Sequence, residues 1–312
     1  MNPVQQAARA DYVRSLLREI PLPRNQVAAA SGLSNTYIRD LEQGNIANVP
    51  REKLIAFAVA LNLSLKAIDE MLNRFDRAPL SAADIGLFLQ TAGQRRFSSA
   101  LVPIRDDFTL GLVLLSTEQI AGGHVIVSSE PTVCLRRTGH VRYAQRRLAD
   151  SHPVHGPLVE AIAGHRRVTL LQNLRKHPVR QYICRHCLQD YIRHCEDPVE
   201  KRWRSLHLEA VAQALQTHPN WQFLLIDTCP TFIFTLKTPA DRSGAGDRLV
   251  ITRQAPHRFQ GRRLGKLAGF VTENTPVVEN FRKELESIAG VVVEEFLDRR
   301  RLLGFLRDLA AR

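Results

Sequence analysis

The segment from Leu22 to Gly44 constrains the fold of this chain more than any other. Its apolar residues follow a helical spacing on both sides of Gly32, and glycine adopts a positive φ at little cost. Ser34 offers a hydroxyl that can cap a following helix, and Gly44 stands where helices commonly end. The pattern therefore predicts two short helices joined by a tight turn.

The second of these helices separates apolar from polar residues. Ile38 and Leu41 are three positions apart and are expected to face inward. The outward side carries four polar residues: Asn35, Thr36, Arg39 and Asp40. This predicts a helix that packs along one side and presents polar side chains near its start.

The spacing resembles the helix-turn-helix of the lambda-repressor and Cro-like family, the xenobiotic-response-element class of bacterial and phage regulators. The residues that carry the resemblance are Leu22, Val27, Ala28, Gly32, Leu33, Ser34, Ile38, Leu41, Glu42 and Gly44. A helical pattern from Tyr12 to Ile20 precedes the motif, and two more follow at residues 51–61 and 63–72. The resemblance implies an all-α domain of five helices over residues 1–75.

In this family the second helix of the motif lies in the DNA major groove. Carried over by position, the expected base contacts are Asn35, Thr36, Arg39 and Asp40. The expected phosphate contacts are Arg24, Asn25, Ser34, Tyr37 and Asn45. Asp40 suits this role only if it accepts from a cytosine amine or pairs with Arg39, because phosphates repel a carboxylate. The alternative is that these side chains are a solvated helix surface.

Two residues depart from the family pattern. Arg24 stands where the family usually has glutamine, and Pro23 replaces a hydroxyl cap. Arginine is a strong partner for phosphate, so we expect backbone binding to persist while base preference changes.

Length and apolar content bound the rest of the protein. The 312 residues are 44% hydrophobic, which is enough for two or three domains with buried cores. No run approaches the ~18 apolar residues of a membrane span, and the first residues lack an apolar signal-peptide core. We therefore expect a cytoplasmic protein without a membrane partner. The five cysteines are an odd number in a chain without an export signal, which favours reduced thiols over a framework of disulfide bonds.

The net charge of +12 lies mostly outside the motif. Residues 1–78 hold ten Lys and Arg against eight Asp and Glu. The excess elsewhere is consistent with an arginine-rich surface, with added contacts to the DNA backbone, or with an anionic effector.

The remaining residues favour a mixed α/β (α+β) domain over residues 99–312, joined by a connector at residues 76–98. Ser81 and Asp84 have capping-box spacing and predict a helix through about Phe97, either as connector or as dimerisation element. Strands are predicted at residues 111–116, 124–128, 132–136, 221–227, 231–237 and 248–252. A hairpin-like link is predicted at 228–230, a loop at 241–247, and helices over most of 141–215, at 281–288 and at 292–311.

This second domain is expected to dimerise and to bind a small-molecule or protein effector. The last helix offers apolar residues for a dimer contact, with core packing as the alternative: Phe296, Leu297, Leu302, Leu303, Phe305 and Leu306.

Residues 177–195 hold three cysteines and three histidines. Cys184 and Cys187 have the spacing of a metal knuckle, and His194 and Cys195 are candidates for further ligands. Such thiolates could also bind an iron–sulfur cluster or act in redox sensing. However, Cys184, Tyr191 and Cys195 share one stripe of a helix, which favours a structural role for free cysteines. We therefore expect no metal and no cofactor.

No catalytic motif stands out. The chain contains no Walker, GxGxxG, HExxH or GxSxG motif, Gly244 and Gly246 fit a turn, and Asp227 has no evident partner. The sequence thus predicts a non-enzymatic, sequence-specific regulator that binds an operator in double-stranded DNA as a dimeric repressor. A metal or redox sensor, a DNA-targeted processing enzyme and an antitoxin-like interaction protein remain the alternatives.

Overall fold

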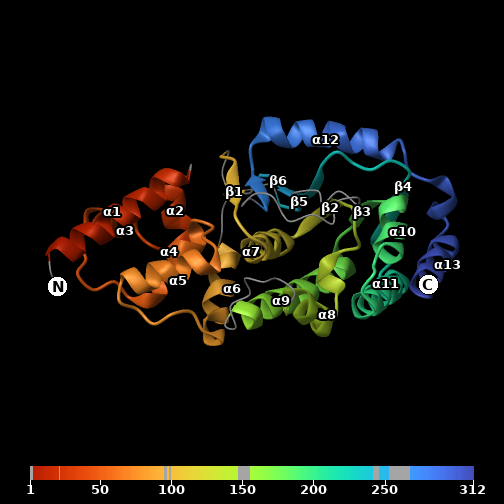
Figure 1. Ribbon diagram of the computed structural model, residues 1–312. Coiled ribbons are helices and arrows are strands. Elements are labelled where there is room, and N and C mark those ends of the chain that lie inside the picture. The colour runs from red at the N-terminus through yellow and green to blue at the C-terminus, as the bar shows by residue number, and fades with distance from the viewer. Residues whose placement is uncertain are drawn as a thin grey trace.

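The computed structural model describes residues 3–20, 22–94, 97, 100–146, 155–241, 246–252 and 268–312. The molecule is elongated (Figure 1), with a helical bundle at the N-terminal end and an α/β body that carries the C-terminus at the other. We use "the bundle" for helices α1–α5 and "the α/β body" for the residues from 100 onward. None of the described helices is both long and apolar enough to cross a bilayer.

The bundle confirms the predicted all-α, five-helix N-terminal region. Its helices are α1 (Pro3–Glu19), α2 (Arg24–Ser31), α3 (Asn35–Gln43), α4 (Arg51–Ala60) and α5 (Leu65–Arg74). The first helix begins at Pro3, well before the predicted Tyr12. Helix α4 is the centre of the bundle, because every residue from Leu54 to Ala60 is buried.

A short 3₁₀ turn, η1 (Ala82–Asp84), and helix α6 (Ile85–Gln94) join the bundle to the α/β body. The predicted capping box is present, since the side chains of Ser81 and Asp84 each accept from the other's backbone N–H. Phe88 is fully buried on α6, and its ring meets Phe108 of the α/β body edge to face at 5.1 Å. One hydrophobic cluster runs from the bundle through α6 into the α/β body.

The α/β body is built on one seven-stranded sheet in the order β1-β7-β6-β5-β2-β3-β4. The strands are β1 (Val102–Ile104), β2 (Gly122–Ser128), β3 (Val179–Cys184), β4 (Trp221–Ile226), β5 (Ile233–Pro239), β6 (Arg248–Thr252) and β7 (Gly269–Thr272). Strands β2, β3 and β4 are parallel, and the remaining pairs are antiparallel. This confirms the α+β class that the sequence predicts.

Helices cover both faces of the sheet (Figure 1). Helix α12 (Thr275–Ala289) lies over one face, where Tyr182 and Cys184 of β3 are buried. The opposite face carries α7 (Asp107–Glu118), α9 (His155–Lys176) and α11 (Pro198–Thr217), and Val179 and Ile183 point to that side. The remaining elements are η2 (Val133–Leu135), α8 (Thr138–Arg146), α10 (Arg185–Arg193), η3 (Glu294–Leu297) and α13 (Arg299–Ala310).

Two predicted strands are helical in the structure. Residues 111–116 lie inside α7, which begins at the capping box of Asp106 and Thr109 and is buried on several sides. A short apolar run does not by itself distinguish a buried helix from a buried strand. Residues 132–136 contain the 3₁₀ turn η2 instead of a strand.

The topology differs from the prediction at two further points. Strand β3 lies within residues 141–215, which are predicted mostly helical, and β1 and β7 were not predicted. Strands β4 and β5 do not form a hairpin: β4 pairs with β3, whereas β5 pairs with β2 and β6. The strands predicted at 124–128, 221–227 and 248–252 are present as β2, β4 and β6.

The ends of other predicted elements also shift. Helix α12 begins at Thr275, earlier than predicted, and the helix predicted at 292–311 is divided into η3 and α13. The predicted loop at 241–247 falls partly on residues 242–245, which lie outside the described residues. Residues 95–96, within the helix predicted to reach Phe97, also lie outside them.

The C-terminal helix packs into its own chain. Leu302, Leu306 and Leu309 are buried in a cluster with α11, so core packing accounts for these apolar residues. Phe296 and Phe305 are partly buried against the same cluster, and Leu297 remains 60% exposed.

Candidate nucleic-acid interface

The turn between α2 and α3 follows the local rules that predicted it. Gly32 ends α2 with a φ of 67°, in the left-handed region that glycine accepts without a Cβ clash. Ser34 precedes α3 in an extended conformation, and its hydroxyl accepts from the backbone N–H of Tyr37 at 3.0 Å. The direction in which α3 leaves the turn is therefore set by these two residues.

Helix α3 is anchored along its inner side. Ile38 and Leu41 are buried, with exposed fractions of 0% and 3%. Gly44 ends the helix with a φ of 76°, and a Cβ there would lie 3.2 Å from the Cβ of Ala10 on α1. Arg14 of α1 also donates to the carbonyl oxygen of Glu42 at 3.0 Å. This packing against α1 leaves the opposite side of α3 facing outward.

The four predicted base contacts lie on this outer side. Asn35, Thr36 and Arg39 are exposed, and Asp40 is half-buried. Together with the start of α2, the first turns of α3 form an open hollow of about 480 Å³, lined by Arg24, Asn25, Asn35, Thr36 and Arg39. The bundle forms one end of the molecule (Figure 1), so the α/β body does not cover α3.

The charges around this hollow are only partly balanced. Arg24 forms an ion pair with Glu42 at 2.7 Å, and its hydrogen bond to that carboxylate raises the pKa of Arg24. Within the described residues, Arg39 and Asp40 do not pair with each other or with another ion. Of the two conditions under which Asp40 suits a DNA contact, pairing with Arg39 is therefore not met in this structure. Arg39 therefore presents an unbalanced cation at the outer face of α3.

Tyr37 and Asn45 differ in how they are placed. Asn45 is exposed, and its amide donates to the side chain of Gln43 at 3.0 Å. Tyr37 is half-buried with its ring 4.2 Å from the Nζ of Lys53, and burial raises the pKa of its hydroxyl. That hydroxyl is covered and makes no hydrogen bond to any of the described residues, so in this conformation it is not offered to a phosphate. Lys53, on α4, is a cation beside this face that the motif did not reveal.

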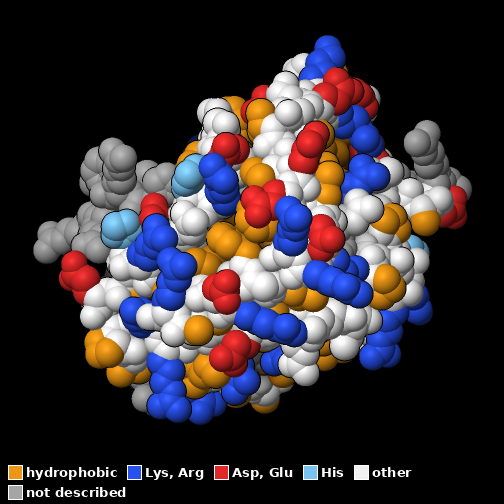
Figure 2. Space-filling view, turned by 90° about the vertical axis from the view of Figure 1, so that its right-hand side faces the viewer, with side chains coloured by type: hydrophobic (Ala, Val, Ile, Leu, Met, Phe, Trp, Pro, Cys, Tyr) orange, Lys and Arg blue, Asp and Glu red, His pale blue; other side chains and the backbone are white. Residues whose placement is uncertain are grey.

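Much of the protein's positive charge lies on the α/β body, but it is not concentrated in one patch on the face around α13. Figure 2 shows that end of the molecule, where Lys and Arg side chains are spread over the surface with Asp and Glu among them. Helix α13 carries four arginines: Arg299, Arg300, Arg301 and Arg307. This face is at the opposite end from α3, so these arginines add no positive charge beside the hollow.

Residues 16–68 match the family model Helix-turn-helix. The matched segment runs from the end of α1 into α5 and contains the whole turn and α3. It confirms the resemblance to the lambda-repressor and Cro-like motif and identifies a DNA-binding helix-turn-helix in the bundle. No curated protein and no solved structure matches the chain.

The cysteine segment has a different geometry from the one the sequence favoured. Cys184 is the last residue of strand β3, not part of a helical stripe, and Cys187 lies in the first turn of α10. Their sulfur atoms are close to that of Cys229, which the sequence analysis did not single out. His194 lies near Asp190 at 3.3 Å, and the thiol of Cys195 contacts the carbonyl oxygen of Asp197 at 3.5 Å. The cluster of three sulfur atoms therefore does not include His194 or Cys195, the two candidates for further ligands.

The ionisation of the three thiols is unequal. A hydrogen bond from the Cys187 thiol is the main cause that lowers the pKa of Cys184 to about 5. The same hydrogen bond raises the pKa of Cys187, and burial raises that of Cys229. Near these thiols, Asp227 forms an ion pair that the sequence did not reveal. The Nε of Arg185 lies 2.5 Å from its carboxylate.

Proposed function

We propose that this protein is a sequence-specific transcription regulator that binds operator DNA through α3 as a dimeric repressor. One observation carries the proposal: the first turns of α3 present Asn35, Thr36 and Arg39 to solvent, beside Arg24 and Asn25 in the same hollow. Asparagine can pair with adenine and arginine with guanine in the major groove, while residues at the start of α2 meet phosphates.

Dimerisation follows from the size of the interface. A single small module buries too little surface for tight and selective binding to an operator. Two copies related by a two-fold axis would place their recognition helices about 34 Å apart, one turn of DNA. We assign the dimer contact to the α/β body, because the bundle must keep α3 open.

The same layout supports regulation by an effector. Helix α6 packs against α4 of the bundle and against α7 of the α/β body within one continuous cluster. An effector that binds two arrangements of the α/β body with different affinity would shift the orientation of the recognition helices. Operator affinity would then change with effector concentration.

The base contacts are tested first. We expect Asn35→Ala and Arg39→Ala each to weaken binding to the selected operator by ~1–3 kcal/mol, or roughly 5- to 150-fold in Kd, with little change on random DNA. The measurement is selection of bound sequences from a random library, followed by fluorescence anisotropy on the selected and a scrambled duplex.

Arg300→Ala is the matched control, because Arg300 is an exposed arginine on α13 at the far end of the molecule. It should leave the operator affinity unchanged. Equal affinity of the unaltered protein for selected and scrambled duplexes would contradict the proposal, and a consensus without two-fold symmetry would contradict the dimer.

The phosphate contact of Arg24 predicts a different signature. Arg24→Ala should weaken binding to every duplex by a similar factor and reduce the slope of log K against log salt by about 0.9. The physical reason is that one fewer phosphate is neutralised and fewer counterions are released. An unchanged slope, or a loss confined to the operator, would show that Arg24 does not contact the backbone.

A further inference from the structure

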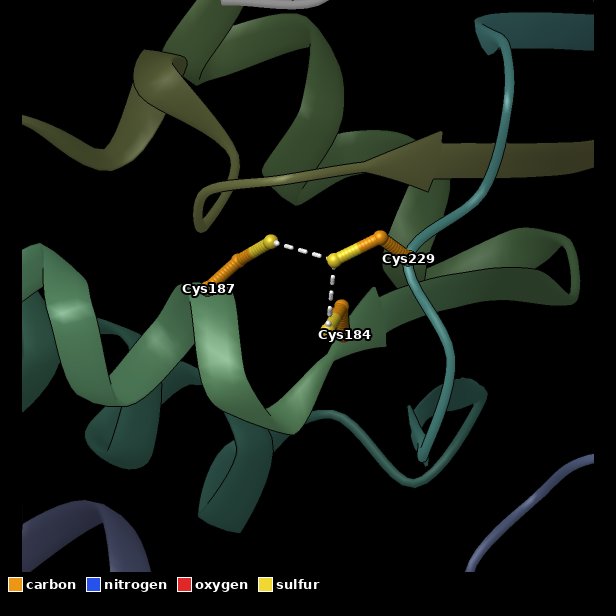
Figure 3. Close-up of side chains that lie close together, drawn as sticks. All are labelled: Cys184, Cys187 and Cys229. Carbon is orange, nitrogen blue, oxygen red and sulfur yellow. Dashed lines mark hydrogen bonds between the residues drawn. The ribbon is translucent and has the colours of Figure 1, made fainter. Parts of the chain in front are cut away.

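Three cysteines from two distant segments meet at one end of the sheet. Cys184 ends strand β3, Cys187 follows in the first turn of α10, and Cys229 lies on the connection from β4 to β5. The sulfur of Cys229 is 3.3 Å from that of Cys184 and 3.5 Å from that of Cys187. Figure 3 shows the Cys187 and Cys229 side chains pointing toward each other, with the Cys184 sulfur below Cys229.

The topology explains why the three residues are together. Strand β4 is at the edge of the sheet beside β3, whereas β5 pairs with β2 on the other side of β3. The connection between them must therefore cross the carboxyl ends of the parallel strands. Cys229 lies on this crossing, above the point where β3 ends at Cys184.

Packing alone leaves one feature of this arrangement unexplained. Cys184 and Cys187 belong to an apolar cluster with residues of β5 and α12, and Cys229 packs against it. A free cysteine in a protein core usually behaves as a small apolar residue among other apolar groups. Here three of the chain's five cysteines place their sulfur atoms within 4.8 Å of one another. Cys184 and Cys187 are buried, whereas Cys229 is only half-buried, so the cluster can be reached from the surface.

The spacing of the sulfur atoms suits a thiolate metal site. A Zn–S bond of about 2.3 Å with tetrahedral angles places two sulfur ligands about 3.8 Å apart. The two sulfur–sulfur distances from Cys229, 3.3 and 3.5 Å, are shorter than this by only a few tenths of an ångström. A small rotation of the side chains would open the space between them for an ion.

The surroundings favour negative charge on the sulfur atoms. Cys184 occupies the N-cap position of α10, a helix of nine residues, and Cys187 lies in its first turn. The free N–H groups and the dipole at a helix N-terminus stabilise thiolates, which are the metal-binding form of cysteine. Arg185 adds a cation close by, although its charge is shared with Asp227.

We propose that Cys184, Cys187 and Cys229 bind one Zn²⁺ ion through their thiolates, with a fourth position open toward solvent. Soft thiolate ligands select Zn²⁺ and Cu⁺ over Mg²⁺, Ca²⁺ and Mn²⁺, and three cysteines supply the charge that such an ion requires. As the ion binds, the thiols release their protons to solvent. The ion would tie the crossing connection to the start of α10.

The test uses the full-length protein purified under reducing conditions and loaded with Zn²⁺. We expect one zinc per chain by elemental analysis after gel filtration, and a visible spectrum typical of tetrahedral thiolate coordination when Co²⁺ replaces Zn²⁺. Cys229→Ser should weaken zinc binding, measured by competition with a chromogenic chelator, by more than about 100-fold. Cys229 is chosen because it is half-buried and on a connection, so its substitution disturbs the core least.

Cys195→Ser is the matched control, since Cys195 lies just after α10 but outside the cluster. It should bind zinc as the unaltered protein does, and thermal unfolding should show that both variants are folded. Less than stoichiometric zinc in the reduced protein would overturn the proposal, as would an equal loss in both variants. A disulfide that involves Cys229 and persists in reducing buffer would also overturn it, in favour of a redox pair.

Discussion

Phe88→Ala is expected to lower the free energy of unfolding by about 3–5 kcal/mol, a large part of the stability of an ordinary domain. Phe88 is fully buried on α6, and its ring packs edge to face against Phe108 at 5.1 Å. Removing the ring leaves a cavity in the cluster that joins the bundle to the α/β body. Such a cavity is costly because neighbouring groups relax only partly.

Urea denaturation followed by two probes can test both the size and the location of this effect. Both tryptophans, Trp203 and Trp221, are in the α/β body, so their fluorescence reports on that part alone. Far-ultraviolet circular dichroism reports on helices in both parts. Because the two parts share one cluster, we expect a single transition whose midpoint falls equally with both probes.

Phe232→Ala provides the comparison, because Phe232 is 48% exposed and its ring contacts Phe281 at the surface. The Phe232→Ala substitution should lower the free energy of unfolding by less than about 1 kcal/mol. If Phe88→Ala also lowered the free energy of unfolding by less than about 1 kcal/mol, α6 would not join the bundle to the α/β body. Two separate transitions, with only the circular dichroism shifted, would show that the bundle unfolds on its own.

The bundle was predictable because its signals are local. Gly32, Ser34 and Gly44 each act within one turn of helix, through a positive φ or a hydroxyl cap. The inward positions of Ile38 and Leu41 follow from helical periodicity. The exposed side of α3 follows from the same pattern, and only its assignment to DNA needed the family resemblance.

The α/β body was less predictable because its strands depend on distant partners. Residues 111–116 are apolar and continuous, which suits a buried strand as well as the buried helix α7 that they form. The proximity of 221–227 and 231–237 suggested a hairpin, but β5 pairs with β6 on one side and, on the other, with β2, which is more than a hundred residues away. Local sequence does not specify such a crossing.

The two candidate sites show the same contrast. The hollow beside α3 contains five residues that were all named from sequence, because they belong to one short motif. The sulfur cluster contains Cys229 from the β4–β5 connection and not His194 or Cys195, the two further candidates that the sequence offered beside Cys184 and Cys187. Pairing between side chains was also missed, as with Arg24 and Glu42, since spacing alone does not show which neighbour a long side chain contacts.

The second large effect is expected for Glu118→Ala, with a loss of about 3–5 kcal/mol in the free energy of unfolding. Glu118 ends α7, and its carboxylate accepts from the Nη2 of Arg166 on α9 at 2.6 Å. The two side chains are 3% and 10% exposed. Burial lowers the pKa of Lys237 to about 8, and the Glu118 carboxylate opposes that shift. Removing the carboxylate therefore leaves the buried guanidinium of Arg166 without its anion, and it also removes a negative charge that favours the charged form of Lys237.

Glu70→Ala is the control for this change, because the pair of Glu70 and Arg74 lies on the surface with both side chains about half exposed. Losing this surface ion pair should lower the free energy of unfolding by no more than about 0.5 kcal/mol. Adding Arg166→Met to Glu118→Ala should restore a large part of the stability, since the cost comes from the charge left behind and not from the lost contact. A double variant as unstable as Glu118→Ala alone would contradict this account and assign the effect to packing between α7 and α9.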